Sequence, residues 1–191
     1  MLVVGVCGSP HPDGSSAHAL RRALAALRRE AIDTSFVDLS ALSIAPCRGC
    51  FGCREGGLCV QEDDMAPLLD ELRGCDGVLL ASPVYMGSVS GQLKVWMDRT
   101  VALRADRGYG LGGRIGGGIA CGGFRNGGQE LTLQAMHTFF LQQDMLAISD
   151  GPPLSHGGAA LVGDARTDEV GLETVDFLAR RMARALAERR D

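Results

Sequence analysis

Four cysteines at positions 47, 50, 53 and 59 form the pattern C-x2-C-x2-C-x5-C. The two short gaps let three sulfur atoms approach one point from a tight turn, and the longer gap returns the fourth from the opposite side. Thiolates enclose an iron-sulfur cluster in this way, and glycines within the pattern leave room for sharp turns. The pattern predicts a redox metal centre whose ligands are Cys47, Cys50, Cys53 and Cys59. A tetrahedral zinc site is the alternative.

Apolar, strand-like segments alternate with amphipathic helical patterns along the rest of the chain. Strands are predicted at 2–7, 34–39, 77–82, 114–121 and 146–149, and helices at 15–30, 63–73, 90–103, 128–144 and 167–190. This alternation is typical of a parallel sheet with crossover helices. It predicts a single α/β domain over residues 1–191, with a doubly wound five-stranded parallel sheet of order 2-1-3-4-5.

Two segments stand apart from this alternation. The cysteine-rich segment, residues 42–60, is an insertion in the connection after the second predicted strand. Residues 150–163 are rich in glycine and proline but too apolar for a mere linker, so we expect them to close over a neighbouring part of the molecule.

In a sheet of this order, ligands bind beyond the carboxyl ends of the strands, where the loops after strands one, three and four converge. The first loop, residues 8–16, opens a helix and carries the hydroxyls of Ser9, Ser15 and Ser16. Free N–H groups and the positive end of a helix dipole suit a phosphate. The alternative for Ser15 is that it only caps the helix.

The other two loops also have unusual compositions. Residues 82–88 form a rigid turn whose Tyr85 and Met86 could line the edge of a flat ring, the alternative being ordinary packing. Residues 121–130 contain four glycines before a helix, where the backbone can approach a ligand closely.

Three stretches together resemble one family: Gly8-Ser9-Pro10, Ser82-Pro83-Val84-Tyr85 with the following 90–94, and residues 125–130. They are similar to the flavodoxin-like NAD(P)H-dependent FMN reductases and, with the cysteine pattern, to the iron-sulfur flavoprotein branch. The resemblance covers nearly the whole chain. It departs at His11 and Pro12, where members often carry Arg or Lys, and this would weaken charge pairing with a phosphate at high pH.

The resemblance implies two cofactors, FMN and a 4Fe-4S cluster, and NAD(P)H as the candidate electron donor. The FMN phosphate would be bound by Ser9, His11, Ser15 and Ser16. The ring would be flanked by Pro83, Val84, Tyr85, Met86 and Gly87, and its pyrimidine side would face Gly122, Gly123, Gly127 and Gly128. The cluster would be ligated by Cys47, Cys50, Cys53 and Cys59.

Composition restricts the classes of binding partner and the cellular compartment that we expect. A net charge of −4 and a pI near 5.6 argue against nucleic acid and anionic membranes as partners, because both require a basic surface. The chain opens directly on a strand-like segment and has no membrane-length apolar run, so we expect no signal peptide and a cytoplasmic location. Seven cysteines in a reducing compartment favour metal or redox chemistry over disulfides, and Cys7 and Cys75 are expected to be small buried hydrophobic residues.

We therefore expect a flavin-dependent oxidoreductase in which FMN exchanges electrons with the cluster or with an external small-molecule or protein acceptor. No catalytic side chain is assigned, because the flavin performs the bond chemistry. A homodimer or homotetramer is expected, since the glycine-rich segment 42–60 exposes Phe51 and Leu58. Two alternatives remain: a cluster-free NAD(P)H-dependent FMN or quinone reductase, and a non-enzymatic electron carrier or redox sensor with zinc or switchable disulfides.

Overall fold

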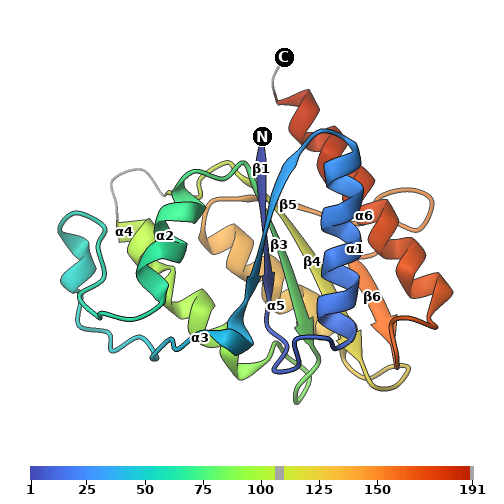
Figure 1. The fold of residues 1–191 in the computed structure, drawn as a ribbon, viewed down its shortest axis with the longest axis horizontal. Helices are drawn as coiled ribbons and strands as arrows, with labels where there is room; N and C mark the ends of the chain where they lie inside the picture. The colour runs from blue at the N-terminus through green and yellow to red at the C-terminus, as the bar shows by residue number, and fades with distance from the viewer. Residues whose placement is uncertain (106–109, 190–191) are drawn as a thin grey trace.

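A computed structural model describes residues 1–105 and 110–189 and places a parallel sheet between two layers of helices (Figure 1). The strand order is β2-β1-β3-β4-β5, as the sequence predicts, and every pair of neighbouring strands is parallel. The first five strands are β1 (Leu2–Cys7), β2 (Asp33–Asp38), β3 (Gly77–Pro83), β4 (Ile115–Gly122) and β5 (Leu146–Ile148). The central strands β3 and β4 are buried along nearly their whole length, as expected for a sheet covered on both faces.

A sixth strand, β6 (Ala159–Val162), divides the fifth position of the sheet in two. β5 pairs with residues 115–117 of β4, and β6 pairs with residues 119–122 of the same strand. Because β3 occupies the other side of β4, β5 and β6 lie in line along one edge. The prediction of five strands is wrong at this point. Residues 150–163 do not simply close over a neighbour, since their last part completes the sheet.

The helices form two layers with different partners. α1 (Ser15–Arg29) and α6 (Glu169–Glu188) pack against each other on one face of the sheet. The opposite face is covered by α2 (Met65–Arg73), α3 (Gly91–Arg99), α4 (Val101–Ala105) and α5 (Gln129–Gln142). The single helix predicted over residues 90–103 is thus two helices that meet at Thr100. Its hydroxyl donates to the carbonyl of Met97 and accepts from Nε2 of Gln143.

Alternate residues of each central strand feed two hydrophobic cores. Val3 and Cys7 of β1 pack toward α1 and α6, whereas Val4 and Val6 pack toward the other layer. β4 contains three consecutive glycines, and a Cβ atom on Gly116 would lie 2.5 Å from the ring of Phe140. The missing side chain therefore lets α5 lie close against the sheet, which fixes the loop that precedes this helix.

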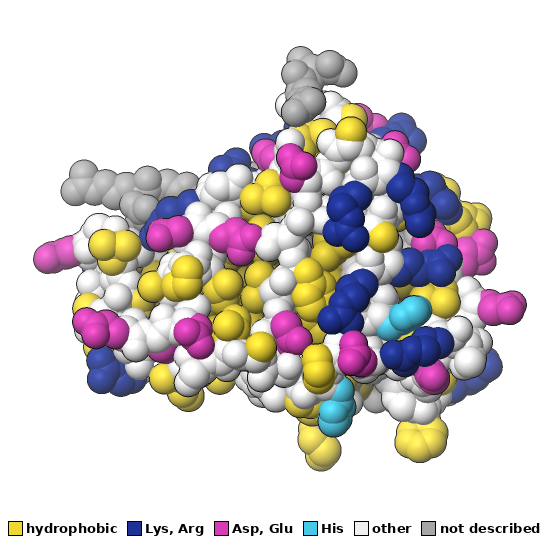
Figure 2. Space-filling view, in the orientation of Figure 1, with side chains coloured by type: hydrophobic (Ala, Val, Ile, Leu, Met, Phe, Trp, Pro, Cys, Tyr) yellow, Lys and Arg dark blue, Asp and Glu magenta, His cyan; other side chains and the backbone are white. Residues whose placement is uncertain are grey.

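The strands run downward in Figure 1, so the loops after β1, β3 and β4 gather at the lower edge. The cysteine-rich segment lies to one side, near α2 and α4, on the layer opposite α1 and α6. Figure 2 shows basic side chains over the α1 and α6 side of this view and hydrophobic side chains projecting from the lower edge. In the described ranges, no helix combines the length and the apolar character needed to cross a membrane.

Candidate functional site

All four cysteines of the predicted metal centre line one cavity of about 290 Å³. Cys47 and Cys50 are exposed, Cys53 and Cys59 are half-buried, and none of them forms a disulfide. Burial raises the pKa of the Cys53 thiol, and the negative charge of the other three cysteines raises it further. Within residues 1–105 and 110–189, no three His, Cys, Asp or Glu side chains surround a single point closely enough to hold one metal ion. The structure therefore gathers the four thiols around a shared space without converging them on one atom.

Backbone turns shape this cavity. Gly49 and Phe51 have φ values of 62° and 60°, and Gly56 and Gly57 have φ values of 86° and 68°. These left-handed conformations suit glycine, while Phe51 pays a steric cost for its turn. A short 3-10 turn, η2 (Gly52–Arg54), follows and carries Cys53. The sharp reversals bring cysteines from both arms of the segment to the same cavity.

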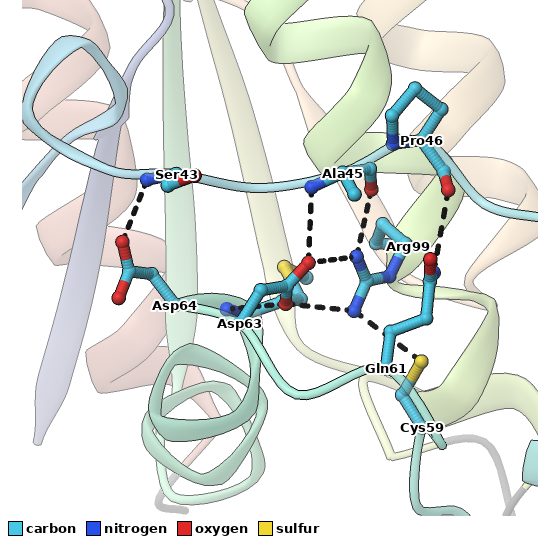
Figure 3. Close-up of polar contacts among 9 residues, drawn as sticks. Ser43, Ala45, Pro46, Cys59, Gln61, Asp63, Asp64 and Arg99 are labelled. Atoms are coloured by element: carbon cyan, nitrogen blue, oxygen red, sulfur yellow. Dashed lines mark hydrogen bonds and ion pairs between the residues drawn. The ribbon is translucent and has the colours of Figure 1, made fainter.

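A buried ion pair closes the base of the segment (Figure 3). Arg99, at the end of α3, donates from Nη1 to Oδ2 of Asp63 at 2.6 Å and from Nη2 to Oδ1 at 2.9 Å. The side chain of Arg99 is 1% exposed and that of Asp63 is 13% exposed. The hydrogen bonds from Arg99 are the main reason that the pKa of Asp63 falls to about 2. This pair is therefore charged and largely shielded from water at neutral pH.

The same guanidinium also contacts both arms of the cysteine segment. Nη1 donates to the carbonyl of Ala45 at 2.7 Å, before the first cysteine, and Nη2 donates to Sγ of Cys59 at 3.4 Å, the last cysteine (Figure 3). Asp63 accepts in turn from the N–H of Ala45 at 3.0 Å. One arginine thus connects α3, a carboxylate, the entry of the segment and one predicted ligand.

Further hydrogen bonds join the two arms side by side. The N–H of Ser43 donates to Oδ2 of Asp64 at 2.7 Å, and Nε2 of Gln61 donates to the carbonyl of Pro46 at 3.3 Å. The sequence predicts Asp63 and Asp64 as the first residues of a helix, but α2 begins at Met65. Asp64 is the N-cap residue of α2, and Oδ1 of Asp63 accepts from the N–H of Met65 at 3.1 Å. Both carboxylates also bind the cysteine segment, which is a role that helix patterns do not reveal.

In the first loop at the sheet edge, the structure places the predicted phosphate ligands at the start of α1. Ser9 is buried, and its hydroxyl accepts from the N–H of His11 and donates to the carbonyl of the same residue, both at 3.1 Å. Ser16 is also buried, and His11 is exposed. α1 starts after Gly14, so the N–H groups of its first turn are those that a helix leaves without an internal acceptor.

Ser15 does not cap α1. Its hydroxyl donates to the carbonyl of Gly163 and accepts from the N–H of Ala165, both at 3.1 Å. The N-cap of α1 is Gly14, so the alternative that Ser15 caps the helix is wrong. Ser15 ties the first loop to the segment that follows β6.

The loop after β3 turns tightly and exposes two large side chains. Tyr85 and Ser88 exchange backbone hydrogen bonds at 2.9 and 3.0 Å, with Met86 and Gly87 at φ values of 51° and 74° between them. Tyr85 is 44% exposed and Met86 is fully exposed, whereas Pro83 and Val84 are half-buried. Exposure of Tyr85 and Met86 is inconsistent with packing in the core.

The loop after β4 meets the loop after β3 at Gly128. This glycine has φ 104°, and a Cβ atom on it would lie 3.1 Å from Cα of Gly87 and 3.3 Å from Cγ1 of Val84. Gly122 is buried, and a Cβ atom there would strike the amide of Gln129, whereas Gly123 and Gly127 are exposed. Glycine is therefore needed where the two loops touch.

Two side chains to which the sequence analysis assigns no site role, although both lie in stretches that carry the family resemblance, hold these loops in place. The hydroxyl of Ser90 donates to the carbonyl of Gly8 at 2.6 Å, which joins the first and second loops. Gln129 accepts from the N–H of Gly127 and donates to the carbonyl of Phe124, both at 2.9 Å, which braces the third loop. The three loops thus form one edge, with α1 pointing its N-terminus at it and Tyr85, Met86 and Phe124 exposed around it.

Two of the three remaining cysteines behave as the sequence predicts. Cys7 and Cys75 are buried, and so is Cys121, which follows the same pattern on β4. Burial raises the pKa of Cys75 and Cys121 to about 12, so these thiols stay protonated at neutral pH. All three are buried, unlike the four exposed or half-buried thiols around the cavity.

Comparison with known proteins agrees with this geometry. Residues 1–160 match the family model described as NADPH-dependent FMN reductase. An iron-sulfur flavoprotein of Methanocaldococcus jannaschii is 42% identical over 187 residues, with 96% of each chain covered. An iron-sulfur flavoprotein of Methanosarcina thermophila is 34% identical, with 97% of this chain and 95% of that protein covered. Among solved structures, a flavodoxin-like WrbA-like protein from Agrobacterium tumefaciens superposes with a TM-score of 0.68 at 17% identity, covering 98% of both chains.

Proposed function

This chain belongs to the NADPH-dependent FMN reductase family, in its iron-sulfur flavoprotein branch, and on that premise we propose that it passes electrons between FMN and a 4Fe-4S cluster or an external acceptor. Membership of the family makes it an FMN-dependent oxidoreductase. The cluster ligands in this proposal are Cys47, Cys50, Cys53 and Cys59, within a cluster-binding loop over residues 42–60.

The observation that carries the proposal is the shared cavity of the four free thiols. The donor set fits an iron-sulfur cluster, which is bound by four cysteine thiolates. The N–H of Arg99 already points at one of these sulfur atoms, as is common for groups around a bound metal centre. When bound, the cluster supplies one-electron transfer, and the loop supplies ligands, turns and partial exclusion of water.

A single zinc ion is the alternative metal centre for these four thiols. Tetrahedral zinc requires four sulfurs about 2.3 Å from one centre. The four thiols line the cavity, but no three of them surround one point closely enough for a single ion. A cluster presents a separate iron to each cysteine. Iron, inorganic sulfide and zinc analysis of the purified protein distinguishes the two metal centres.

The loops at the carboxyl edge of the sheet support FMN as the second cofactor. The first turn of α1 offers free N–H groups and a positive dipole end to a phosphate. We propose that Ser9, His11, Ser15 and Ser16 surround the phosphate, with the bond of Ser15 to Gly163 also fixing that loop. The flavin ring would lie between two further groups, Pro83, Val84, Tyr85, Met86 and Gly87 on one loop and Gly122, Gly123, Gly127 and Gly128 on the other.

We also propose an electron donor, an acceptor and an oligomeric state for this protein. NAD(P)H is the electron donor, and a small molecule or a redox protein is the external acceptor. Phe51 and Leu58 are 62% and 65% exposed beside the cavity, and a second subunit that covers them would make a homodimer or homotetramer. Seven unpaired cysteines favour a reducing compartment, the cytoplasm.

A cluster-free FMN or quinone reductase is the second candidate. It is favoured by the exposure of Cys47 and Cys50 and by the absence of a single-ion site in the described parts of the chain. The experiment compares wild type with the four single Cys→Ala variants under anaerobic conditions, following NAD(P)H oxidation and reduction of a one-electron acceptor. We expect flavin reduction to survive in the variants while delivery to the one-electron acceptor falls. Equal rates of both reactions in all five proteins would favour the second candidate.

A further inference from the structure

We propose that Arg99 is a positioning residue for the cysteine centre: its guanidinium fixes the sulfur of Cys59 and, with the carboxylate of Asp63 opposing its charge, sets the electrostatic environment of the bound cluster. This inference rests on the proposed function, because it concerns how the chain holds and tunes the cluster. It goes further by assigning opposite roles to two residues that lie outside the cysteine pattern.

The guanidinium makes more contacts than a structural ion pair requires. Each Nη atom binds one oxygen of Asp63, and each also binds the cysteine segment, Nη1 at the carbonyl of Ala45 and Nη2 at Sγ of Cys59 (Figure 3). The planar fork of arginine permits this double use, whereas the compact ammonium group of lysine does not have the same geometry.

Arg99 belongs to a helix that packs into the core. Leu93 and Trp96 of α3 are buried at 0% and 1% exposure, and Arg99 continues the same face of the helix. The hydroxyl of Ser90 accepts from the N–H of Leu93 and so caps the helix. A capped helix with a buried face therefore presents a hydrogen-bond donor to a segment that has little regular secondary structure.

This placement has an electrostatic consequence. A donor that contacts a ligand sulfur stabilises the more negative, reduced form of a cluster, and hydrogen bonds to sulfur are among the features that set cluster potentials. The carboxylate of Asp63 lies on the same guanidinium and opposes its positive charge. Loss of Arg99 should therefore lower the reduction potential, and neutralisation of Asp63 should raise it.

The test uses the holoprotein, purified anaerobically as wild type, Arg99→Met, Arg99→Lys and Asp63→Asn. The matched control is Arg22→Met, which breaks a two-bond ion pair with Asp176 between α1 and α6, far from the cysteine segment. Iron and inorganic sulfide per FMN, the thermal unfolding temperature and the midpoint potential of the cluster are measured for each protein.

We expect Arg99→Met to lose at least half of its iron, and its remaining cluster to have a lower potential. Asp63→Asn should keep its iron and have a higher potential, and Arg99→Lys should lie between wild type and Arg99→Met. A tenfold change in the preference for the reduced state corresponds to about 59 mV for a one-electron couple. The control should match wild type in iron content and potential.

Shifts of the same sign in Arg99→Met and Asp63→Asn, or wild-type iron and potential in Arg99→Met, would overturn the inference. If both of these variants lose all iron, Arg99→Lys decides. Restored iron supports the positioning role, and lost iron assigns the pair only to folding of the segment. Wild type without iron or sulfide would refute the proposed function itself, so that failure is separate from the failure of the role of Arg99.

Discussion

Neutralising Asp63 should destabilise the folded protein by an amount that the structure allows us to estimate. The pKa of this carboxyl is about 2 in the folded protein, against an ordinary value of 3.8, mainly because Arg99 hydrogen-bonds it. A difference of nearly two units corresponds to about 2.5 kcal/mol of stability at pH 7. The residue is 13% exposed, so solvent screens this interaction only partly. Asp63→Asn should therefore lower the free energy of unfolding by about 2.5 kcal/mol at pH 7.

The stabilisation by Asp63 depends on pH in a direction that follows from its lowered pKa. The folded pKa lies below the unfolded value, so the stabilisation is present above pH 3.8 and is lost as the pH falls toward 2. At pH 3.5 about three quarters of it should remain, and the deficit of Asp63→Asn should shrink to about 1.8 kcal/mol. The gap between the two proteins should thus be constant from pH 7 to pH 5 and narrow below pH 4.

The assay is urea unfolding of metal-free, reduced protein at pH 7, 5 and 3.5, followed by circular dichroism. Asp176→Asn is the control, because Asp176 is 30% exposed and pairs with an Arg22 that is 44% exposed. Such a pair contributes about 0–1 kcal/mol. A deficit below about 0.5 kcal/mol for Asp63→Asn at pH 7, or one that stays constant at pH 3.5, would refute the reasoning about the buried pair.

Three further predictions concern FMN and assembly. The double variant Ser9→Ala with Ser16→Ala should bind FMN more weakly, since each hydrogen bond to a charged phosphate contributes about 1.5–3 kcal/mol. An unchanged dissociation constant for FMN would refute the proposal that these two serines bind its phosphate. Gly128→Ala should add about 1–3 kcal/mol of backbone strain at φ 104° and push the loops after β3 and β4 apart, which weakens FMN binding in fluorescence titrations. Gly91→Ala, where a Cβ atom meets nothing within 4 Å, should bind FMN like wild type. Light scattering at micromolar concentration should show at least a dimer, and a monomer with full cofactor content would contradict the proposed cover over Phe51 and Leu58.

The sequence predicts the sheet well because its signals are local and periodic. Buried strands such as β3 are continuous apolar runs, and the strand-helix alternation together with chain direction restricts the strand order. β6 escapes prediction because it is a four-residue strand within a stretch whose glycines and prolines indicate loops. The break between α3 and α4 at Thr100 is not predicted, because the apolar pattern continues from one helix into the other.

Some residues of the candidate site can also be predicted from the sequence, and others cannot. The cysteines and the loop glycines are visible as spacing, and the structure brings each group together. The Arg99–Asp63 pair is not visible, because it joins residues 36 positions apart and depends on how α3 meets the cysteine segment. One local signal exists: Arg99 lies three residues after the buried Trp96, on a face that is otherwise apolar. A buried arginine at such a position requires a partner, although the sequence does not identify which carboxylate supplies it.

The central claim is that Cys47, Cys50, Cys53 and Cys59 together bind a 4Fe-4S cluster in a protein that also binds FMN. The most direct measurement is iron, inorganic sulfide, zinc and FMN per chain in anaerobically purified wild type, Cys50→Ala and the control Cys75→Ala, whose thiol is buried outside the loop. We predict about four iron and four sulfide with one FMN in wild type and in the control, and loss of iron with retention of FMN in Cys50→Ala. Wild-type protein that contains FMN but no iron, or that contains zinc in place of iron, would contradict the claim.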